Sequence, residues 1–208
     1  PVYHSAVALL ETPDEPGVPN QFLFEQRPDL ATTDMCNPGA GQLFGGHREP
    51  GDTFWKTLRK ELNEEVNLPP DELLPSPTGV ERGPYLNGNL LSIVPWQAAR
   101  LRPLKGGASE LIVKHFSVAL YHVWVPEVYG DNLRLSSKEQ ARGTKIGHLP
   151  ATLEALAEAE ARLAAFPYRA LKSFLRGETM KGNMHEGLTV AGNRPAANHS
   201  RLTVGGVQ

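Results

Sequence analysis

The stretch GGHREPGDTFWKTLRKELNEEVNL, Gly45 to Leu68, joins a glycine-rich segment to a segment with helical periodicity. The periodicity predicts a helix from Asp52 to about Val66, because two consecutive prolines follow at positions 69 and 70. On a helical wheel of about 100° per residue, four apolar side chains fall within about 80° of one another. This stripe must face the core, and it consists of Trp55, Leu58, Leu62 and Val66.

Three carboxylates of the same helix occupy different places on this wheel. Glu65 projects from the apolar face itself, Glu61 borders that face, and Glu64 lies roughly 60° further round. Carboxylates at these spacings repel one another, and a buried one is costly unless it is paired, protonated or bound to a cation. Oxygen ligands suit hard ions such as Mg²⁺ or Mn²⁺, so the helix predicts a metal site. A solvated acidic helix face is the alternative for ELNEEV taken alone.

The glycines before the helix predict a tight loop whose backbone can approach a ligand closely. A carbonyl of Gly45 or Gly46 is a candidate for a further oxygen ligand of a hard metal ion. Asp52 stands where the N-cap of the helix belongs, and capping is its ordinary structural role.

The rest of the chain predicts strands at Val2 to Leu10, Gln21 to Gln26, Leu90 to Ala99 and Leu111 to Val125. A Pro- and Gly-rich hairpin loop joins the first two, and a loop from Pro126 to Thr144 follows the fourth. A strong helix is expected from Ala151, with Pro167 interrupting it. Strands dispersed around two helices predict a layered α+β domain.

Composition limits the function classes. The 208 residues have a formal net charge of -2, with Lys and Arg scattered along the chain, which argues against nucleic acid as a partner. No apolar run reaches the roughly 18 residues of a membrane span, and the N-terminus lacks the pattern of a signal peptide. The single Cys36 excludes an internal disulfide, so the expected location is the cytoplasm.

The stretch from Gly46 to Leu68 resembles the Nudix box, usually written G-x5-E-x7-R-E-U-x-E-E-x-G-U, where U is a bulky aliphatic residue. Three positions depart from the pattern: Asp52 stands for Glu, Lys60 for Arg and Asn67 for Gly. Lys cannot make the bidentate fork that Arg offers a carboxylate, whereas Asn tolerates the left-handed conformation of a helix C-terminal Gly. The remaining motif positions match at the same spacing: Glu61, Leu62, Glu64, Glu65 and Leu68.

This resemblance implies an α/β/α sandwich with a mixed sheet, in which the box forms a loop, a helix and a loop. We expect a Nudix domain over residues 1–176 and a C-terminal extension over residues 177–208 that is flexible or forms an interface. The implied activity is Mg²⁺- or Mn²⁺-dependent hydrolysis of a diphosphate linkage in a small nucleoside-diphosphate-type molecule. The expected partners are that substrate and, because many relatives dimerise, a second copy of the chain.

The resemblance also implies roles for the box residues. Glu61 and Glu65 are the expected principal metal ligands, with Glu64 as a further ligand, directly or through water. Glu64 and Glu65 are also expected in catalysis. Asp52 and Lys60 are expected to support the loop and orient the carboxylates.

Two residues outside the box are further candidates. Many family members take an extra base or ligand from a carboxylate ahead of the last helix, and Glu139 occupies a comparable place. Arg27, at the end of the second strand, resembles a position from which the family reaches substrate. For both residues an ordinary surface charge is the alternative.

Two other functions are compatible with the sequence. The departures from the box suggest a Nudix-fold domain that binds a nucleotide-like ligand without cleaving it. An isomerase of the isopentenyl-diphosphate type shares the fold and uses a Cys and a Glu, and Cys36 lies upstream of the box as that reading requires.

Overall fold

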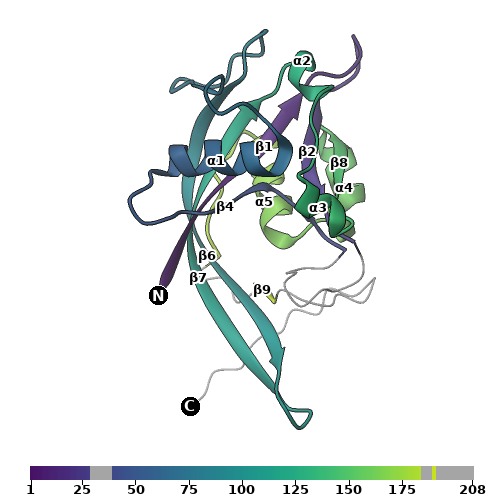
Figure 1. Cartoon of the computed structure of the whole chain (residues 1–208). Helices are drawn as coiled ribbons and strands as arrows, with labels where there is room; N and C mark the ends of the chain where they lie inside the picture. The colour runs from purple at the N-terminus through teal and green to yellow at the C-terminus, as the bar shows by residue number, and fades with distance from the viewer. Residues whose placement is uncertain (29–38, 184–188, 191–208) are drawn as a thin grey trace.

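The computed structural model describes residues 1–28, 39–183 and 189–190 (Figure 1). Its strands are β1 (Val2–Thr12), β2 (Gln21–Gln26), β3 (Gly41–Gln42), β4 (Phe44–His47), β5 (Leu74–Pro75), β6 (Asn87–Pro103), β7 (Ser109–Trp124), β8 (Lys145–Pro150) and β9 (Thr189–Val190). Its helices are α1 (Phe54–Val66), α2 (Glu127–Gly130), α3 (Ser137–Ala141), α4 (Leu153–Ala159), the 3₁₀ turn η1 (Glu160–Arg162) and α5 (Ala165–Leu175).

The strands form one mixed sheet with the order β3-β2-β1-β7-β6-β5. β1 runs parallel to β7 and antiparallel to both β2 and β4, which pair with different halves of it. The four predicted strands are confirmed, and β6 and β7 are longer than expected. Their hairpin extends well beyond the body of the molecule (Figure 1).

Helices cover both faces of the sheet. Alternate residues of β1 point to opposite sides, so Ala8 and Leu10 join the core under α1, whereas Leu9 joins the core under α4 and α5. From α1, Leu58, Leu62 and Val66 are buried in the first core, as the wheel predicts. The expected α/β/α sandwich with a mixed sheet is therefore confirmed (Figure 1).

Two helix boundaries differ from the prediction. The N-cap of α1 is Thr53, whose side chain accepts a hydrogen bond from the Lys56 N–H at 3.1 Å, so the expected capping role of Asp52 is wrong. The helix predicted from Ala151 is interrupted before Pro167 and not at it. Pro167 lies in the first turn of α5, where an N–H has no intrahelical partner to lose.

The first residues of the expected C-terminal extension pack on the sheet. Asn183 is 1% exposed, and its side chain bonds the backbone N–H and C=O of Gln97 at 2.5 and 2.7 Å. Met180 joins the core under α5. In the described part of the chain, no helix is both long and apolar enough to cross a membrane.

Candidate active site

Glu65 lies where β4, the strand that contains Gly45 and Gly46, meets α1. Its carboxylate accepts a hydrogen bond of 2.8 Å from the backbone N–H of Gly45. Burial raises the pKa of Glu65 to about 8; the Gly45 hydrogen bond opposes this, and the negative charges of Glu25, Glu61 and Glu139 add to it. Three carboxylates, from β2, α1 and α3, thus act on Glu65 at this point, which is the situation that a cation relieves.

Glu61 lies against Gly46. A Cβ placed on Gly46 would overlap the carboxyl group of Glu61, so only glycine permits this approach. Burial, followed by the charge of Glu64, raises the pKa of Glu61. Gly45 has φ +137°, and a side chain there would collide with the carbonyl oxygen of Ala6 on β1. The paired glycines therefore let β4 pass closely between β1 and the carboxylates of α1.

The other three box positions lie further from this point. Glu64 is exposed to solvent on α1. Lys60 donates to Glu49 at 2.7 Å, which raises the pKa of Lys60, and Asp52 pairs with Lys56 at 2.5 Å. Asp52 and Lys60 therefore fasten the loop to the helix, and no hydrogen bond of either to Glu61, Glu64 or Glu65 is found.

Glu139 lies in the short helix α3, within the segment expected to be a loop. Its side chain is only 13% exposed and accepts hydrogen bonds from Arg142 at 3.1 Å and from Thr144 Oγ1 at 3.3 Å. Ser136, the N-cap of α3, donates its N–H to the Glu65 carbonyl at 3.0 Å, so α3 is attached to the end of α1. The structure brings Glu139 to the carboxylates of the box.

Arg27 follows β2 and pairs with Glu25. Its Nε and Nη2 donate to the two carboxylate oxygens of Glu25 at 3.2 and 3.0 Å. Sequence reasoning missed Glu25, which is 6% exposed and lies on the side of β2 that faces α1. One feature of the sequence could have indicated Glu25. It is a charged residue at an inward-facing position of the strand QFLFEQ, two residues after the buried Leu23.

Gln42 is a second residue that the sequence did not indicate. It lies directly opposite Glu25 in the antiparallel β2–β3 pair, so the two side chains occupy the same face. The amide nitrogen of Gln42 is buried and has no hydrogen-bond partner. A buried donor without an acceptor is costly, and an oxygen of a bound ligand would satisfy it.

The donor set fits a hard divalent cation. The carboxylates of Glu61 and Glu65, together with a backbone carbonyl of Gly45 or Gly46, would supply oxygen ligands of the type that Mg²⁺ and Mn²⁺ prefer. Within the described residues, no three His, Cys, Asp or Glu side chains converge closely enough to hold an ion by themselves. A cation at this point therefore requires carbonyl, water or phosphate oxygens in addition to the carboxylates.

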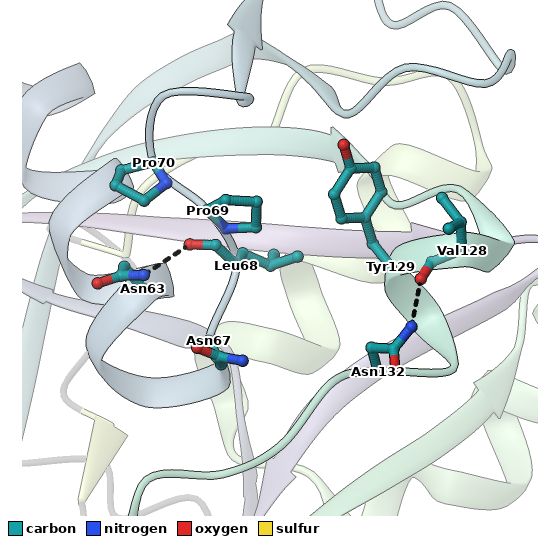
Figure 2. Close-up of a pocket in the computed structure, with 8 residues that line it drawn as sticks. All are labelled: Asn63, Asn67, Leu68, Pro69, Pro70, Val128, Tyr129 and Asn132. Atoms are coloured by element: carbon teal, nitrogen blue, oxygen red, sulfur yellow. Dashed lines mark hydrogen bonds between the residues drawn. The ribbon is translucent and has the colours of Figure 1, made fainter.

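A hollow of about 460 Å³ lies elsewhere, between the C-terminal end of α1 and α2 (Figure 2). On α1 its wall includes Asn63, which is about 200° around the helix from Glu65. The hollow therefore opens on the side of α1 away from the carboxylates. Its lining consists of Asn63, Asn67, Leu68, Pro69, Pro70, Val128, Tyr129 and Asn132.

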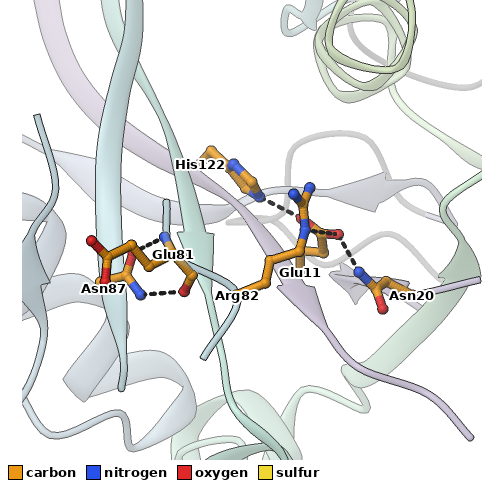
Figure 3. Close-up of polar contacts among 6 residues, drawn as sticks. All are labelled: Glu11, Asn20, Glu81, Arg82, Asn87 and His122. Atoms are coloured by element: carbon orange, nitrogen blue, oxygen red, sulfur yellow. Dashed lines mark hydrogen bonds and ion pairs between the residues drawn. The ribbon is translucent and has the colours of Figure 1, made fainter. Parts of the chain in front are cut away.

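A separate buried polar network lies on the other face of the sheet (Figure 3). Glu11, 3% exposed, accepts hydrogen bonds from His122 at 2.6 Å, from Arg82 at 3.0 Å and from Asn20 at 2.6 Å. Glu11 belongs to the same side of β1 as Leu9, which faces α4 and α5. The network ties two loops to the sheet and is not part of the carboxylate site.

Cys36, the cysteine on which the isomerase alternative depends, falls outside the described residues. The predictions for it are therefore not addressed by the structure.

Comparison with known proteins identifies the class to which this fold and site belong. Residues 3–101 match the family model of the NUDIX domain, a range that contains all but the first residue of β1 and the whole of β4 and α1. No curated protein sequence matches the chain.

Solved structures resemble the chain at low identity. A mutT/nudix family protein from Listeria innocua is 18% identical with a TM-score of 0.50, over 85% of this chain and 94% of that one. An Ap4A hydrolase from C. elegans is 17% identical with a TM-score of 0.45, over 85% of this chain and 98% of that one.

The mixed sheet with helices on both faces agrees with the fold of the mutT/nudix family structure that resembles the chain. Residues 3–101 of the chain match a NUDIX domain, and this match supports membership of the Nudix superfamily. Members of this superfamily generally hydrolyse pyrophosphate bonds and generally use divalent metal ions.

Proposed function

We propose that the protein hydrolyses a diphosphate linkage in a small nucleoside-diphosphate-type molecule, with Mg²⁺ or Mn²⁺ held at the carboxylates of α1. The observation that carries this proposal is the position of Glu65. Burial and three neighbouring carboxylates raise the pKa of Glu65, and its carboxylate accepts a hydrogen bond from the backbone N–H of Gly45. Such crowding of acids is maintained in proteins where a cation or a shared proton offsets the repulsion.

The residues of the site have different proposed roles. Glu61 and Glu65 are the proposed principal ligands, with a carbonyl of Gly45 or Gly46 beside them. Glu64, which is exposed, is the proposed outer ligand that acts directly or through water. When bound, the cation supplies positive charge to the phosphate oxygens and lowers the pKa of an attacking water.

Proton transfer and substrate contact fall to residues outside the helix. Glu139, held by Arg142 and Thr144, is the proposed base that accepts a proton from the attacking water. Arg27 is the proposed contact to a phosphate oxygen of the substrate, because a guanidinium matches phosphate geometry. The cytoplasm as the location, and a homodimer as the assembled form, stay expectations of the sequence.

One observation favours a second candidate function, a domain that binds such a molecule without cleaving it. Lys60 stands where the box has Arg, and it pairs with Glu49 on the loop instead of orienting a carboxylate of α1. A site with less well oriented carboxylates retains binding more readily than turnover.

A panel of nucleoside-diphosphate compounds, assayed with Mg²⁺, Mn²⁺ or a chelator, separates the two candidates. We expect turnover of at least one compound that requires the metal and falls by about 100-fold or more in Glu65→Gln. Glu72→Gln, which removes an exposed carboxylate elsewhere, is the control and should leave the rate unchanged. Full activity of Glu65→Gln would contradict the mechanism, and binding without product would favour the second candidate.

A further inference from the structure

We infer that Glu25 is a positioning residue of this site, which holds Arg27 in the orientation needed to contact a substrate phosphate. The inference rests on the proposed function, and it assigns a role to a residue outside the box. Glu25 acts through Arg27 and does not itself touch the substrate or the cation.

The contact between the two side chains fixes the guanidinium group. Both oxygens of Glu25 are used, each by a different nitrogen of Arg27, at 3.2 and 3.0 Å. A two-point contact defines the plane of the guanidinium as well as its position, which a single hydrogen bond does not. The side chain of Glu25 is only 8% exposed and that of Arg27 is 22% exposed, so water competes little with the pair.

The backbone around Glu25 is equally fixed. Glu25 lies opposite Gln42 of β3 and opposite Ile146 of β8, so it is paired on both sides within the sheet. The N–H of Arg27 donates to the carbonyl of Ala40 at 3.5 Å, which holds the end of β2 against the segment leading to β3. Because Glu25 is held in this way, its position stays fixed even if the side chain of Arg27 changes its orientation.

Charge gives a reason for the pair. A lone cation placed among Glu65, Glu139 and their neighbours would pair with one of them and remove it from the metal site. The two-point contact with Glu25 holds Arg27 beside the site through a carboxylate that is not one of the proposed metal ligands.

A double-mutant cycle tests whether Glu25 acts through Arg27. The variants are Glu25→Gln, Arg27→Gln and the two together, and the readout is calorimetric binding of methylenediphosphonate in the presence of Mg²⁺. We expect Glu25→Gln to weaken binding about tenfold and Arg27→Gln about tenfold or more, with the double variant no weaker than Arg27→Gln alone. In steady-state kinetics the loss should appear in KM, with kcat changed much less.

Glu11→Gln is the matched control, because it also removes a buried carboxylate that pairs with an arginine. It should lower stability and leave binding unchanged, and Arg82→Gln, at a half-exposed position, replaces it if it does not fold. Glu25→Asp keeps the charge with a shorter reach, so it should bind more tightly than Glu25→Gln; it serves as the test variant if Glu25→Gln does not fold.

Several results would overturn the inference: unchanged binding in Glu25→Gln, losses that add in the double variant, or no rescue by aspartate. If the wild type binds methylenediphosphonate and the variants show the expected losses, but no substrate is turned over, only the proposed hydrolysis is contradicted. A wild-type protein that does not bind the compound at all would overturn both.

Discussion

At the scale of single residues, the site depends more on the close approach of the β4 backbone to the carboxylates of α1 than on any one functional group. Gly46 lets the Glu61 carboxyl group reach the backbone of β4, and Gly45 offers its N–H to Glu65. The wheel predicted that Glu65 projects from the apolar face of the helix, because that placement follows from spacing alone. Glu25 and Gln42 could not be predicted with it, since their proximity arises from pairing between strands.

Gly46→Ala tests the close approach. Its methyl group would occupy the space of the Glu61 carboxyl group, which is the end of a flexible side chain and can move away. We therefore expect a folded protein whose kcat falls by about 100-fold, since a displacement of this size misplaces a ligand. Circular dichroism and steady-state kinetics are the measurements.

Gly83→Ala is the control for this substitution, because a Cβ on Gly83 meets no atom within 4 Å. It should change neither fold nor rate. A Gly46→Ala protein with normal kcat would show that Glu61 does not need its present position.

At the scale of elements, α1 is terminated by a residue that the family pattern has as glycine. Asn67 has φ 60° and ψ 28°, and among the described residues it is the one non-glycine residue with a positive φ. The N–H groups of Asn67 and Leu68 bond the carbonyls of Asn63 and Leu62, which closes the helix end. The prediction that Asn67 tolerates the left-handed conformation is confirmed.

Substitution at Asn67 should change stability in both directions. Asn67→Gly should raise the free energy of unfolding by about 0.5 kcal/mol, and Asn67→Ala should lower it by about 1 kcal/mol, because a Cβ is disfavoured at positive φ. Urea denaturation followed by circular dichroism measures both. If Asn67→Ala were as stable as the wild type, the left-handed end of α1 would be contradicted.

The helix boundaries show where sequence reasoning reached its limit. Asp52 and Thr53 are both good caps, and propensity does not separate them. The structure uses Thr53 because Asp52 is already paired with Lys56. The break before α5 likewise depends on Leu163, which is buried and bridges to Gly41 from a distant part of the chain.

At the scale of the whole molecule, the two faces of the sheet have different tasks. The face under α1 carries the carboxylate site, and the opposite face holds the network around Glu11 (Figure 3). Burial alone would raise the pKa of Glu11, but hydrogen bonds from His122, Arg82 and Asn20 lower it to about 2. Because this pKa lies below the ordinary value of 4.5, the network favours the folded state only while Glu11 is ionised.

Acid should therefore weaken the fold through Glu11. Its contribution, on the order of 2 kcal/mol after allowance for solvent screening, is present above pH 4.5 and is lost as the pH falls toward 2. Urea denaturation at a series of pH values should show a shallower decline over this range in Glu11→Gln, which is less stable at neutral pH. An identical pH dependence in wild type and variant would contradict the assignment.

The position of a bound divalent cation tests the proposed metal site most directly. A crystal soaked in Mn²⁺ and measured near the manganese absorption edge gives an anomalous difference map. We expect a peak within about 2.2 Å of carboxylate oxygens of Glu61 and Glu65, beside the backbone of Gly45 and Gly46, and no such peak in Glu65→Gln. A peak at another group of residues, or metal-dependent turnover in a crystal form without a peak at α1, would contradict the proposed metal site.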